Sequence, residues 1–290
     1  MEKVIVIGGS GFLGSHVCDK LSDAGHKVRI FDCVESPWLR PDQEMIVGDL
    51  MDKKILEKAI AGCDVVYNFA GLADLDEALE KPVETVKVNV LGNVMLLEAC
   101  RKAQVQRYIY ASTVYVYSRD GGFYRCSKQA AEHYVEEYQS TYGLNYTILR
   151  YGSLYGPRSS ENNGLWRIVK NAMDTNTVSY EGSPEAMREY IHVEDAARAS
   201  IAVLGDDFLN QHVVLTGQET MRVKDLLKML SEILGISQDP RFIEAELHGH
   251  YIRTPYAYQP KLGRKYVPPI HVDLGQGILQ LIYEVQKLSK

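Results

Sequence analysis

Short apolar runs alternate along the first half of the chain with stretches whose apolar residues recur at helical spacing. Residues 4–7 form a β-branched apolar run, which is typical of a buried parallel strand. The next apolar positions, Leu13, Val17 and Leu21, are spaced as on one face of a helix, and Gly25 is placed to end that helix. The pattern therefore predicts a strand, a turn and a helix at the start of the chain.

This alternation of predicted strands and helices continues as far as Thr113. Further strands are predicted at residues 27–31, 45–47, 64–69 and 107–111, and further helices at residues 53–61 and 89–102. The alternation predicts an α/β fold of Rossmann-like type, in which a doubly wound parallel sheet carries helices on both faces. Ligands bind at the carboxyl ends of such strands, where the pattern places Gly8, Asp32, Asn68 and Thr113.

The composition is that of an ordinary globular protein. The 290 residues are 46% hydrophobic and 24% charged, which suffices for a sizeable core in one large or two modest domains. The net charge of -6 argues against a nucleic-acid partner. No apolar stretch approaches the roughly 20 residues of a membrane span, and the N-terminus lacks a signal-peptide profile. We therefore expect a cytoplasmic protein with no membrane partner.

The cysteines and histidines give no indication of a metal site. The 5 cysteines are odd in number and scattered, and no two form a Cys-x-x-Cys pair, which favours reduced thiols over disulfides. Cys126 is expected to be a small helix residue. His248 and His250 flank a glycine, but no carboxylate or thiolate joins them at a ligand-like spacing.

Three glycines directly follow the first predicted strand. Gly8, Gly11 and Gly14 let the backbone turn tightly, approach a pyrophosphate and pack the helix against the strand. The N–H groups at the start of the helix, around Phe12 and Leu13, can bind phosphate oxygens with the help of the helix dipole. Strand, glycines and helix together predict a dinucleotide site.

Asp32 ends the second predicted strand, where dinucleotide-binding folds place an acid. Its carboxylate can accept hydrogen bonds from the adenosine ribose and repels a 2′-phosphate, and no arginine directly follows it. Glu35 either strengthens this preference or is a solvated loop charge. The sequence therefore predicts NAD rather than NADP as the cofactor.

A tyrosine and a lysine four residues apart are the main catalytic candidates. Tyr124 and Lys128 would lie about one turn apart on one helix face, so the ammonium can lie near the phenol. A nearby cation lowers a phenol pKa by about 1 to 3 units, which favours a general base, and the Thr113 hydroxyl can share the substrate proton. A second such pair, Tyr283 and Lys287, follows no hydroxyl-bearing strand and is interpreted as a surface pair.

Taken together, these motifs resemble those of the extended short-chain dehydrogenases/reductases, a group of NAD-dependent nucleotide-sugar epimerases, dehydratases and related enzymes. The resemblance runs almost end to end. It rests on the three glycines, Asp32, residues 48–50 and 68–71, Asn89, residues 112–113, Tyr124 with Lys128, and residues 150–158 and 188–195.

The resemblance implies a cofactor role for two segments that follow predicted strands. In the family, the positions of Asp49 and Leu50 border the adenine, and those of Phe69, Ala70 and Gly71 line the cofactor. We expect the same roles here.

The resemblance also implies the catalytic roles. The positions of Thr113 and Tyr124 handle the proton of a sugar hydroxyl in the family, and that of Lys128 also holds the nicotinamide ribose. Asn89 is expected to be either a cofactor residue or a helix cap.

The second half of the chain resembles the substrate-binding part of the family. Residues 1–157 are predicted to form the NAD-binding Rossmann domain, and residues 158–290 mainly a smaller, interleaved substrate-binding domain. Within that second part, residues from about 186 to 215 are expected to return to the Rossmann sheet. A homodimer is implied, through helices around residues 89–102 and 124–142.

Four residues of the second half are singled out by the resemblance. Arg188 is the best candidate to bind the nucleotide-sugar phosphates, because a guanidinium grips phosphate through two hydrogen bonds. Arg253 is a weaker candidate, and Ser153 stands where the family often has a phosphate-binding asparagine. His192 is expected to be a structural hydrogen-bonding residue.

The sequence departs from the family at two further places. Dehydratases of the family carry an acidic pair after the catalytic threonine, whereas this chain has Val114 and Tyr115, so no general acid for dehydration is expected there. The loop at residues 118–123 is shorter than the family's. With Gly121 and Gly122 it is expected to be a mobile, open rim that admits a sugar larger than a hexose, such as a heptose.

These features predict an NAD-dependent enzyme that transfers hydride at C4 of a nucleotide-activated sugar. It would be a 4-epimerase if the hydride returns to the other face of the ketone, or a net 4-dehydrogenase if the ketone leaves. A 4-ketoreductase and a non-catalytic NAD-binding regulator on the same fold are the alternatives.

Overall fold

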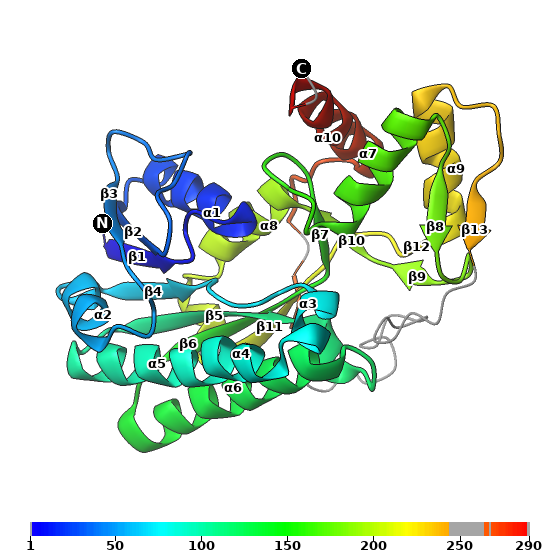
Figure 1. Ribbon diagram of the computed structural model, residues 1–290. Coiled ribbons are helices and arrows are strands. Elements are labelled where there is room, and N and C mark those ends of the chain that lie inside the picture. Colours follow the sequence, from blue (N-terminus) through cyan, green and yellow to red (C-terminus); the bar gives the residue numbers. More distant parts are fainter. Residues whose placement is uncertain (1, 244–263, 267, 289–290) are drawn as a thin grey trace.

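One parallel sheet forms the centre of the molecule (Figure 1). The computed structural model describes residues 2–243, 264–266 and 268–288. The sheet has eight strands in the order β14-β11-β6-β5-β4-β1-β2-β3, which contains the strand order of dinucleotide-binding folds. The predicted Rossmann-like, doubly wound α/β fold is confirmed. Its strands are β1 (Lys3–Ile7), β2 (Lys27–Asp32), β3 (Glu44–Val47), β4 (Val65–Asn68), β5 (Arg107–Thr113), β6 (Tyr146–Tyr151), β11 (Gln211–Leu215) and β14 (Arg264–Lys265).

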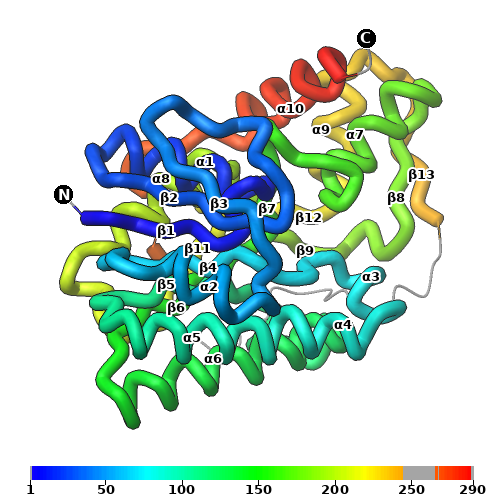
Figure 2. Tube along the Cα trace, turned by 60° about the vertical axis from the view of Figure 1, so that its left-hand side comes forward, coloured from blue at the N-terminus to red at the C-terminus, as the bar shows by residue number. Residues whose placement is uncertain are grey.

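Helices cover both faces of this sheet. Val4 and Val6 of β1 pack toward one helix layer, and Ile5 and Ile7 toward the other, because successive strand residues point to opposite faces. Figures 1 and 2 both show two helices of the second layer, α5 and α6, lying side by side. The first layer is α1 (Phe12–Asp23) and α8 (Val193–Ala202), and the second is α2 (Lys53–Ile60), α5 (Asn93–Lys102) and α6 (Gly122–Tyr142).

Three helices of the second half pack around a separate core. Val169, Leu226 and Leu281 are fully buried in it, one from each helix. The helices are α7 (Gly164–Thr175), α9 (Val223–Leu234) and α10 (Leu274–Leu288). Two-stranded pairs accompany them: β7 (Ser153–Tyr155) with β10 (Tyr190–His192), β8 (Ser179–Glu181) with β13 (Arg241–Ile243), and β9 (Met187–Arg188) with β12 (Met221–Arg222).

The second half of the chain also contributes to the main sheet. From β10 the chain runs through α8 into β11, and β11 pairs with β6 in parallel. Later, β14 pairs with the other side of β11. The functional division into residues 1–157 and 158–290 remains a prediction.

The segment between β4 and β5 differs from its prediction. One helix was expected at residues 89–102, whereas a π-helical turn, η1 (Lys87–Gly92), precedes α5. Two short helices, α3 (Leu75–Glu80) and α4 (Pro82–Val86), come before it. Turns of π-helix are frequent at functional sites, and Asn89 lies within this one. Short 3₁₀ turns are η2 (Val114–Tyr117) and η3 (Asp206–Phe208).

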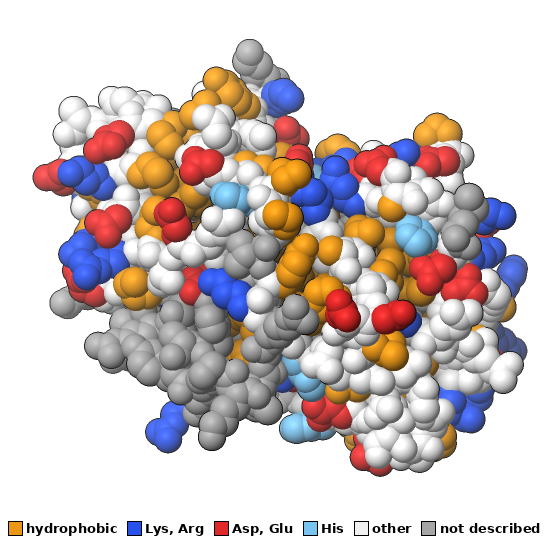
Figure 3. Space-filling model, turned by 180° about the vertical axis from the view of Figure 1, so that it is seen from behind, with side chains coloured by type: hydrophobic (Ala, Val, Ile, Leu, Met, Phe, Trp, Pro, Cys, Tyr) orange, Lys and Arg blue, Asp and Glu red, His pale blue; other side chains and the backbone are white. Residues whose placement is uncertain are grey.

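The surface carries charges of both signs. Figure 3 shows acidic and basic side chains mixed over the described part of one face, with apolar side chains between them. Of the helices that the structure describes, none combines the length and apolar character that crossing a membrane requires.

Candidate active site

The glycine loop joins β1 to α1 at the carboxyl edge of the sheet. Gly8 has a φ of +80°, which favours glycine, and a Cβ added there would lie 2.7 Å from the backbone N of Ala70. A Cβ added at Gly14 would lie only 2.2 Å from the carbonyl oxygen of Gly8. Glycine is therefore required at position 8 by the close approach of the segment after β4, and at position 14 by the close approach of α1 to the loop.

The start of α1 is suited to bind an anion. Gly11 is its N-cap, and no side chain caps the first turn. Phe12 and Leu13 are the first two residues of the helix, so their backbone N–H groups lie at its N-terminus beside the glycine loop. Their side chains pack against the sheet core. A pyrophosphate is the ligand that such a helix end favours.

Asp32 lies at the end of β2, next to this loop. Its Oδ2 accepts a hydrogen bond from the backbone N of Ser10 at 2.9 Å, and its Oδ1 accepts one from the N of Val34 at 3.3 Å. The carboxylate is thus tied to the glycine loop and is only half-buried, which leaves lone pairs for ribose hydroxyls. Arg40, in the loop that follows, forms ion pairs with Asp23 and Asp42 and is not part of a phosphate-binding site.

The adenine side of the predicted cofactor site is formed after β3. Asp49 is exposed, and its Oδ1 accepts a hydrogen bond from the backbone N of Met51 at 2.8 Å. Leu50 is buried against the second helix layer. Asp49 and Leu50 therefore provide one carboxylate and one buried apolar side chain, which suit their predicted position beside an adenine.

The segment after β4 connects the glycine loop to the catalytic candidates. Phe69 stacks on Tyr67 with ring centroids 5.9 Å apart. The next residue, Ala70, touches Gly8, and a Cβ added at Gly71 would lie 3.7 Å from the Nζ of Lys128. The segment thus extends from Gly8 of the glycine loop to the neighbourhood of Lys128, the predicted catalytic lysine.

Asn89 fixes this segment from behind. Its Oδ1 accepts from the backbone N of Leu72 at 2.8 Å, and its Nδ2 donates to the carbonyl oxygen of Leu72 at 3.0 Å and to the Ser127 hydroxyl at 2.9 Å. Asn89 is buried in the π-helical turn, so the alternative of a helix cap is wrong. The side chain holds the segment after β4 against the helix that carries Tyr124.

Tyr124, Thr113 and Lys128 come together at the end of β5. Tyr124 and Thr113 are joined by a side-chain hydrogen bond. The Lys128 Nζ donates to the carbonyl oxygen of Ala111 at 2.7 Å and lies 5.9 Å from the ring centroid of Tyr124. The structure therefore assembles the three predicted catalytic residues, with the amine against the face of the ring.

The ionisation of these residues differs from the sequence prediction. Burial raises the pKa of Tyr124 to about 12, and the hydrogen bond with Thr113 only partly offsets this. Burial also lowers the pKa of Lys128 to about 8, against the opposing effect of the Glu132 charge. The predicted lowering of the Tyr124 pKa by Lys128 is not found in this structure, because burial sets the direction of the shift and only the hydrogen bond with Thr113 opposes it.

Residues 4–217 match the NAD-dependent epimerase/dehydratase family. This match covers well over half of the chain. The chain belongs to the NAD-dependent epimerase/dehydratase family. NAD is its cofactor, and the glycine cradle, the uncapped start of α1 and the carboxylate of Asp32 fit that group.

Individual relatives agree with this family assignment. A UDP-glucose 4-epimerase of Yersinia pestis is 30% identical over 245 residues, which cover 69% of this chain and 72% of that one. A dTDP-glucose 4,6-dehydratase of an Actinoplanes species is 24% identical and covers 97% of this chain and 96% of its own. The crystal structure of Thermus thermophilus UDP-glucose 4-epimerase with NAD has a TM-score of 0.82 and 26% identity over 98% of this chain and 99% of that one.

For this family member, Asp32→Ala should narrow the preference for NAD over NADP. Removing the carboxylate removes its repulsion of the 2′-phosphate, an effect of about tenfold or more for two charges in contact. Titration of both cofactors into wild-type and variant protein measures it. An NADP affinity equal to that for NAD in the wild type would contradict the role given to Asp32, and the same titration of Glu35→Ala decides between the two interpretations of Glu35.

The substrate candidates of the epimerase/dehydratase lie at the edge of the second core. Arg188 is buried in β9, and its guanidinium donates to the carbonyl oxygen of Met187 at 2.9 Å. The backbone N of Ser153 donates to the carbonyl oxygen of Glu189 at 3.1 Å, so Ser153 adjoins the Arg188 segment. Arg253, like His248 and His250, lies outside the described residues.

His192 is a structural hydrogen-bonding residue, as predicted. Its Nδ1 accepts from the backbone N of Glu194 at 3.4 Å, which caps α8. Burial lowers the pKa of His192 to about 4, so the imidazole is neutral under ordinary conditions.

The short loop at residues 118–123 is held in place, which corrects the prediction of a mobile rim. The Arg125 guanidinium donates to the carbonyl oxygens of Ser118 and Arg119. Gly121 has a φ of +96°, and a Cβ there would lie 2.8 Å from the ring of Tyr115. That ring meets the ring of Tyr124 edge to face, so the loop packs on Tyr115, which in turn packs on the predicted catalytic tyrosine.

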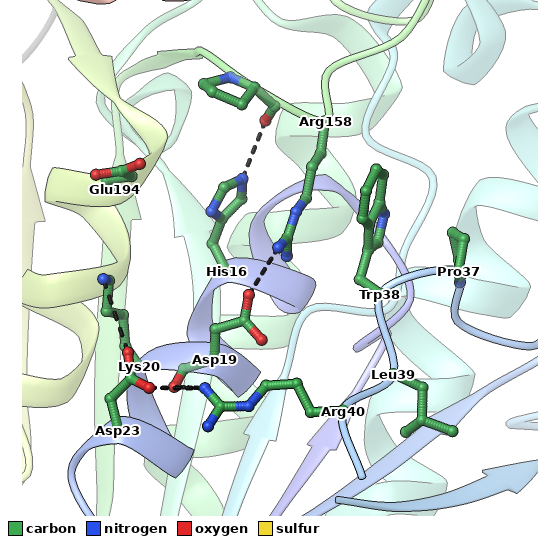
Figure 4. A pocket seen from close by; sticks show the side chains of 11 residues that line it. His16, Asp19, Lys20, Asp23, Pro37, Trp38, Leu39, Arg40, Arg158 and Glu194 are labelled. Carbon is green, nitrogen blue, oxygen red and sulfur yellow. Dashed lines mark hydrogen bonds and ion pairs between the residues drawn. The ribbon is translucent and has the colours of Figure 1, made fainter. Parts of the chain in front are cut away.

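A pocket of about 570 Å³ lies away from this chemistry, on the outer face of α1 (Figure 4). Figure 4 shows the Arg158 side chain between Asp19 and Trp38. The guanidinium forms an ion pair with Asp19 at 2.7 Å and lies 4.6 Å from the Trp38 ring centroid. None of the residues that line the pocket is a predicted site residue. These contacts fasten the chain after β7 to α1.

The sequence analysis missed several residues that support the catalytic group. Ser127 and Glu132 lie on α6 with Tyr124 and Lys128, and Ser127 bonds Asn89. Tyr115 packs on Tyr124, and Arg150 of β6 forms an ion pair with Glu132. The sequence offered one signal for Glu132, because it follows Lys128 by the same four residues that separate Lys128 from Tyr124.

Proposed function

We propose that this protein is an NAD-dependent 4-epimerase of a UDP-linked sugar. The observation that carries the proposal is the Thr113, Tyr124 and Lys128 group, assembled beside the cofactor segment at Gly71. Both UDP-glucose 4-epimerases compared above support UDP-hexoses as the substrate class.

In this proposal the chain's residues move one proton. When bound, NAD supplies the hydride acceptor and, in its oxidised form, a positive charge on the nicotinamide. Tyr124 takes the proton of the C4 hydroxyl through its hydrogen bond with Thr113, and Lys128 keeps a positive charge against the phenol ring. Because burial raises the pKa of Tyr124 to about 12, its phenolate needs a further positive charge nearby.

The residues after Thr113 favour epimerisation over dehydration. Val114 is buried against Val214, and Tyr115 packs on Tyr124. Neither can donate a proton as a carboxylic acid to a departing hydroxyl. Although a 4,6-dehydratase is among the relatives, this chain therefore lacks at those two positions the acid pair that elimination uses in the family.

Incubation of the purified protein with NAD and UDP-glucose tests the proposal. We expect the C4 epimer to form until an equilibrium mixture is reached, without net accumulation of NADH. Stoichiometric NADH would identify a 4-dehydrogenase, and consumption of NADH by a 4-keto sugar would identify a 4-ketoreductase. No turnover with any UDP-, GDP-, CDP- or dTDP-sugar would favour the non-catalytic regulator.

We propose Arg188, Ser153 and Arg253 as contacts of the nucleotide diphosphate. Arg188 ends β9 and Ser153 begins β7, and the backbone N of Ser153 donates to the carbonyl oxygen of Glu189, the residue after Arg188, which supports a shared role. In the same proposal, the short 118–123 loop leaves room for a sugar larger than a hexose. Competition between UDP-glucose and a matched UDP-heptose decides this point, since a large preference for the hexose in kcat/KM would show a closed pocket.

We also propose a homodimer through α5 and α6. Tyr134 and Tyr142 of α6 are 46% and 56% exposed, and Val83 of the adjoining α4 is 79% exposed. Large side chains with apolar surface exposed on adjoining helices favour a partner surface, whereas Val135 of α6 is buried in the core. Light scattering should give twice the chain mass, and a monomer mass at all concentrations would contradict the dimer.

A further inference from the structure

A buried ion pair lies one helical turn beyond the catalytic lysine. The side chains of Arg150 and Glu132 are only 5% and 6% exposed, and their Nη2 and Oε2 atoms are 2.5 Å apart. The Arg150 Nε also donates to Oε1 of Glu132 at 3.0 Å, and its Nη1 donates to the Tyr117 hydroxyl at 2.6 Å. A buried pair of this kind adds little net stability by itself, because desolvating both charges offsets their attraction.

The pair closes a regular set of contacts between α6 and the end of β5. Tyr124, Lys128 and Glu132 are spaced by four residues and share one helix face. They contact three consecutive residues of β5: Tyr124 bonds Thr113, Lys128 donates to the carbonyl oxygen of Ala111, and Glu132 accepts from the hydroxyl of Ser112. The contact between Glu132 and Ser112 therefore fixes the position of α6 along β5 at which Tyr124 and Lys128 make their own contacts.

The carboxylate also acts on Lys128 through charge. Burial lowers the pKa of Lys128, and the Glu132 charge raises it. The ring of Tyr110 lies 4.9 Å from the Lys128 Nζ but carries no formal charge. The other titratable or charged groups near Lys128 and Glu132 include Tyr124, Tyr117, Tyr146, Arg150, His212 and Glu136.

We propose that Glu132 is a positioning residue for Tyr124 and Lys128. Through Ser112 it sets the register of α6 on β5, and it places a negative charge one helical turn from the lysine amine. Arg150 holds that carboxylate in one orientation, because its Nε and Nη2 contact the two carboxylate oxygens separately. The effect of Glu132 on catalysis rests on the proposed function, whereas its effect on the pKa of Lys128 does not.

The ionisation of Lys128 is the direct test, and it needs no substrate. Protein labelled with ¹⁵N at the lysine amines is titrated by NMR, and the Lys128 signal is assigned by its loss in Lys128→Met. Glu132→Gln should lower the titration midpoint of Lys128 by about one pH unit or more, because burial is then opposed by one charge fewer. Glu136→Gln, one turn further along the same helix and half-exposed, is the matched control and should leave the midpoint in place.

Glu132→Gln leaves the buried Arg150 without its ion-pair partner, so Glu132→Gln/Arg150→Met is made alongside it. In the double variant neither Glu132 nor Arg150 remains as an unpaired buried charge. The titration midpoint of Lys128 should again be lower than in the wild type. An unchanged midpoint in a folded variant would overturn the proposal.

Activity provides the second readout. Lys128 acts as an ammonium, so activity is lost as the pH rises through its pKa, and a lower pKa moves that alkaline limb to lower pH. With UDP-glucose, kcat for Glu132→Gln should fall about tenfold, its alkaline limb should move by the same amount as the NMR midpoint, and KM should change little. A shifted midpoint without turnover in any variant or the wild type would reject the proposed function and keep the role of Glu132. A wild-type kcat and pH profile in the variant would reject that role.

Discussion

Replacing Tyr124 by phenylalanine should reduce kcat by roughly 10² to 10⁴, the contribution typical of a positioned general base. Only one hydroxyl is lost, so the fold and the affinity for NAD should be retained. The hydrogen bond with Thr113 disappears with that hydroxyl, and no other described residue bonds to the Thr113 side chain except the backbone N of Tyr115. Turnover of UDP-glucose by the purified variant measures the loss.

The chain provides a matched control for this variant. Tyr283 lies on α10, is 58% exposed, and precedes Lys287 by the same four residues. Its lysine lies 3.9 Å from Glu284, an exposed contact of little energetic weight. Tyr283→Phe should leave turnover unchanged. A Tyr124→Phe variant that is folded and as active as the control would remove the central catalytic role.

Gly14→Ala should weaken NAD binding by roughly 10- to 100-fold. The added Cβ would lie 2.2 Å from the carbonyl oxygen of Gly8 and 2.9 Å from the Cα of Gly9, so α1 must move away from the loop. Overpacking of this kind costs about 1 to 3 kcal/mol, and the displaced helix end no longer presents its N–H groups to the pyrophosphate. Calorimetric titration with NAD measures the change.

Gly164→Ala is the corresponding control. A Cβ at Gly164, in the first turn of α7, would meet no atom within 4 Å. NAD affinity and unfolding temperature should stay close to those of the wild type. If Gly14→Ala binds NAD as tightly as this control, the glycine loop does not hold the pyrophosphate.

The sequence predicted the first five strands of the sheet because their signals are local, whereas it gave no range for β6 or β14. Parallel strands buried on both faces read as continuous apolar runs, as in residues 4–7, and the glycine loop needs a fixed short spacing. The closeness of Tyr124 and Lys128 was predicted for the same reason, because residues four apart share a helix face whenever a helix forms there.

What the sequence could not show depends on contacts between distant segments. The role of Asn89 comes from Leu72 and Ser127, which only the folded chain brings to it. The raised pKa of Tyr124 comes from burial, which spacing does not reveal. The rigidity of the 118–123 loop comes from the reach of Arg125 back across the turn, where glycines alone had indicated freedom.

The fate of the hydrogen at C4 tests the central claim most directly. UDP-glucose carrying deuterium at C4 is incubated with the protein and NAD, and the product is analysed by NMR and mass spectrometry. We predict the C4 epimer with deuterium retained at C4, formed by the wild type and by Tyr283→Phe and lost in Tyr124→Phe. Release of the deuterium to solvent, a 4-keto-6-deoxy product, or an unchanged substrate would contradict hydride transfer and return at C4.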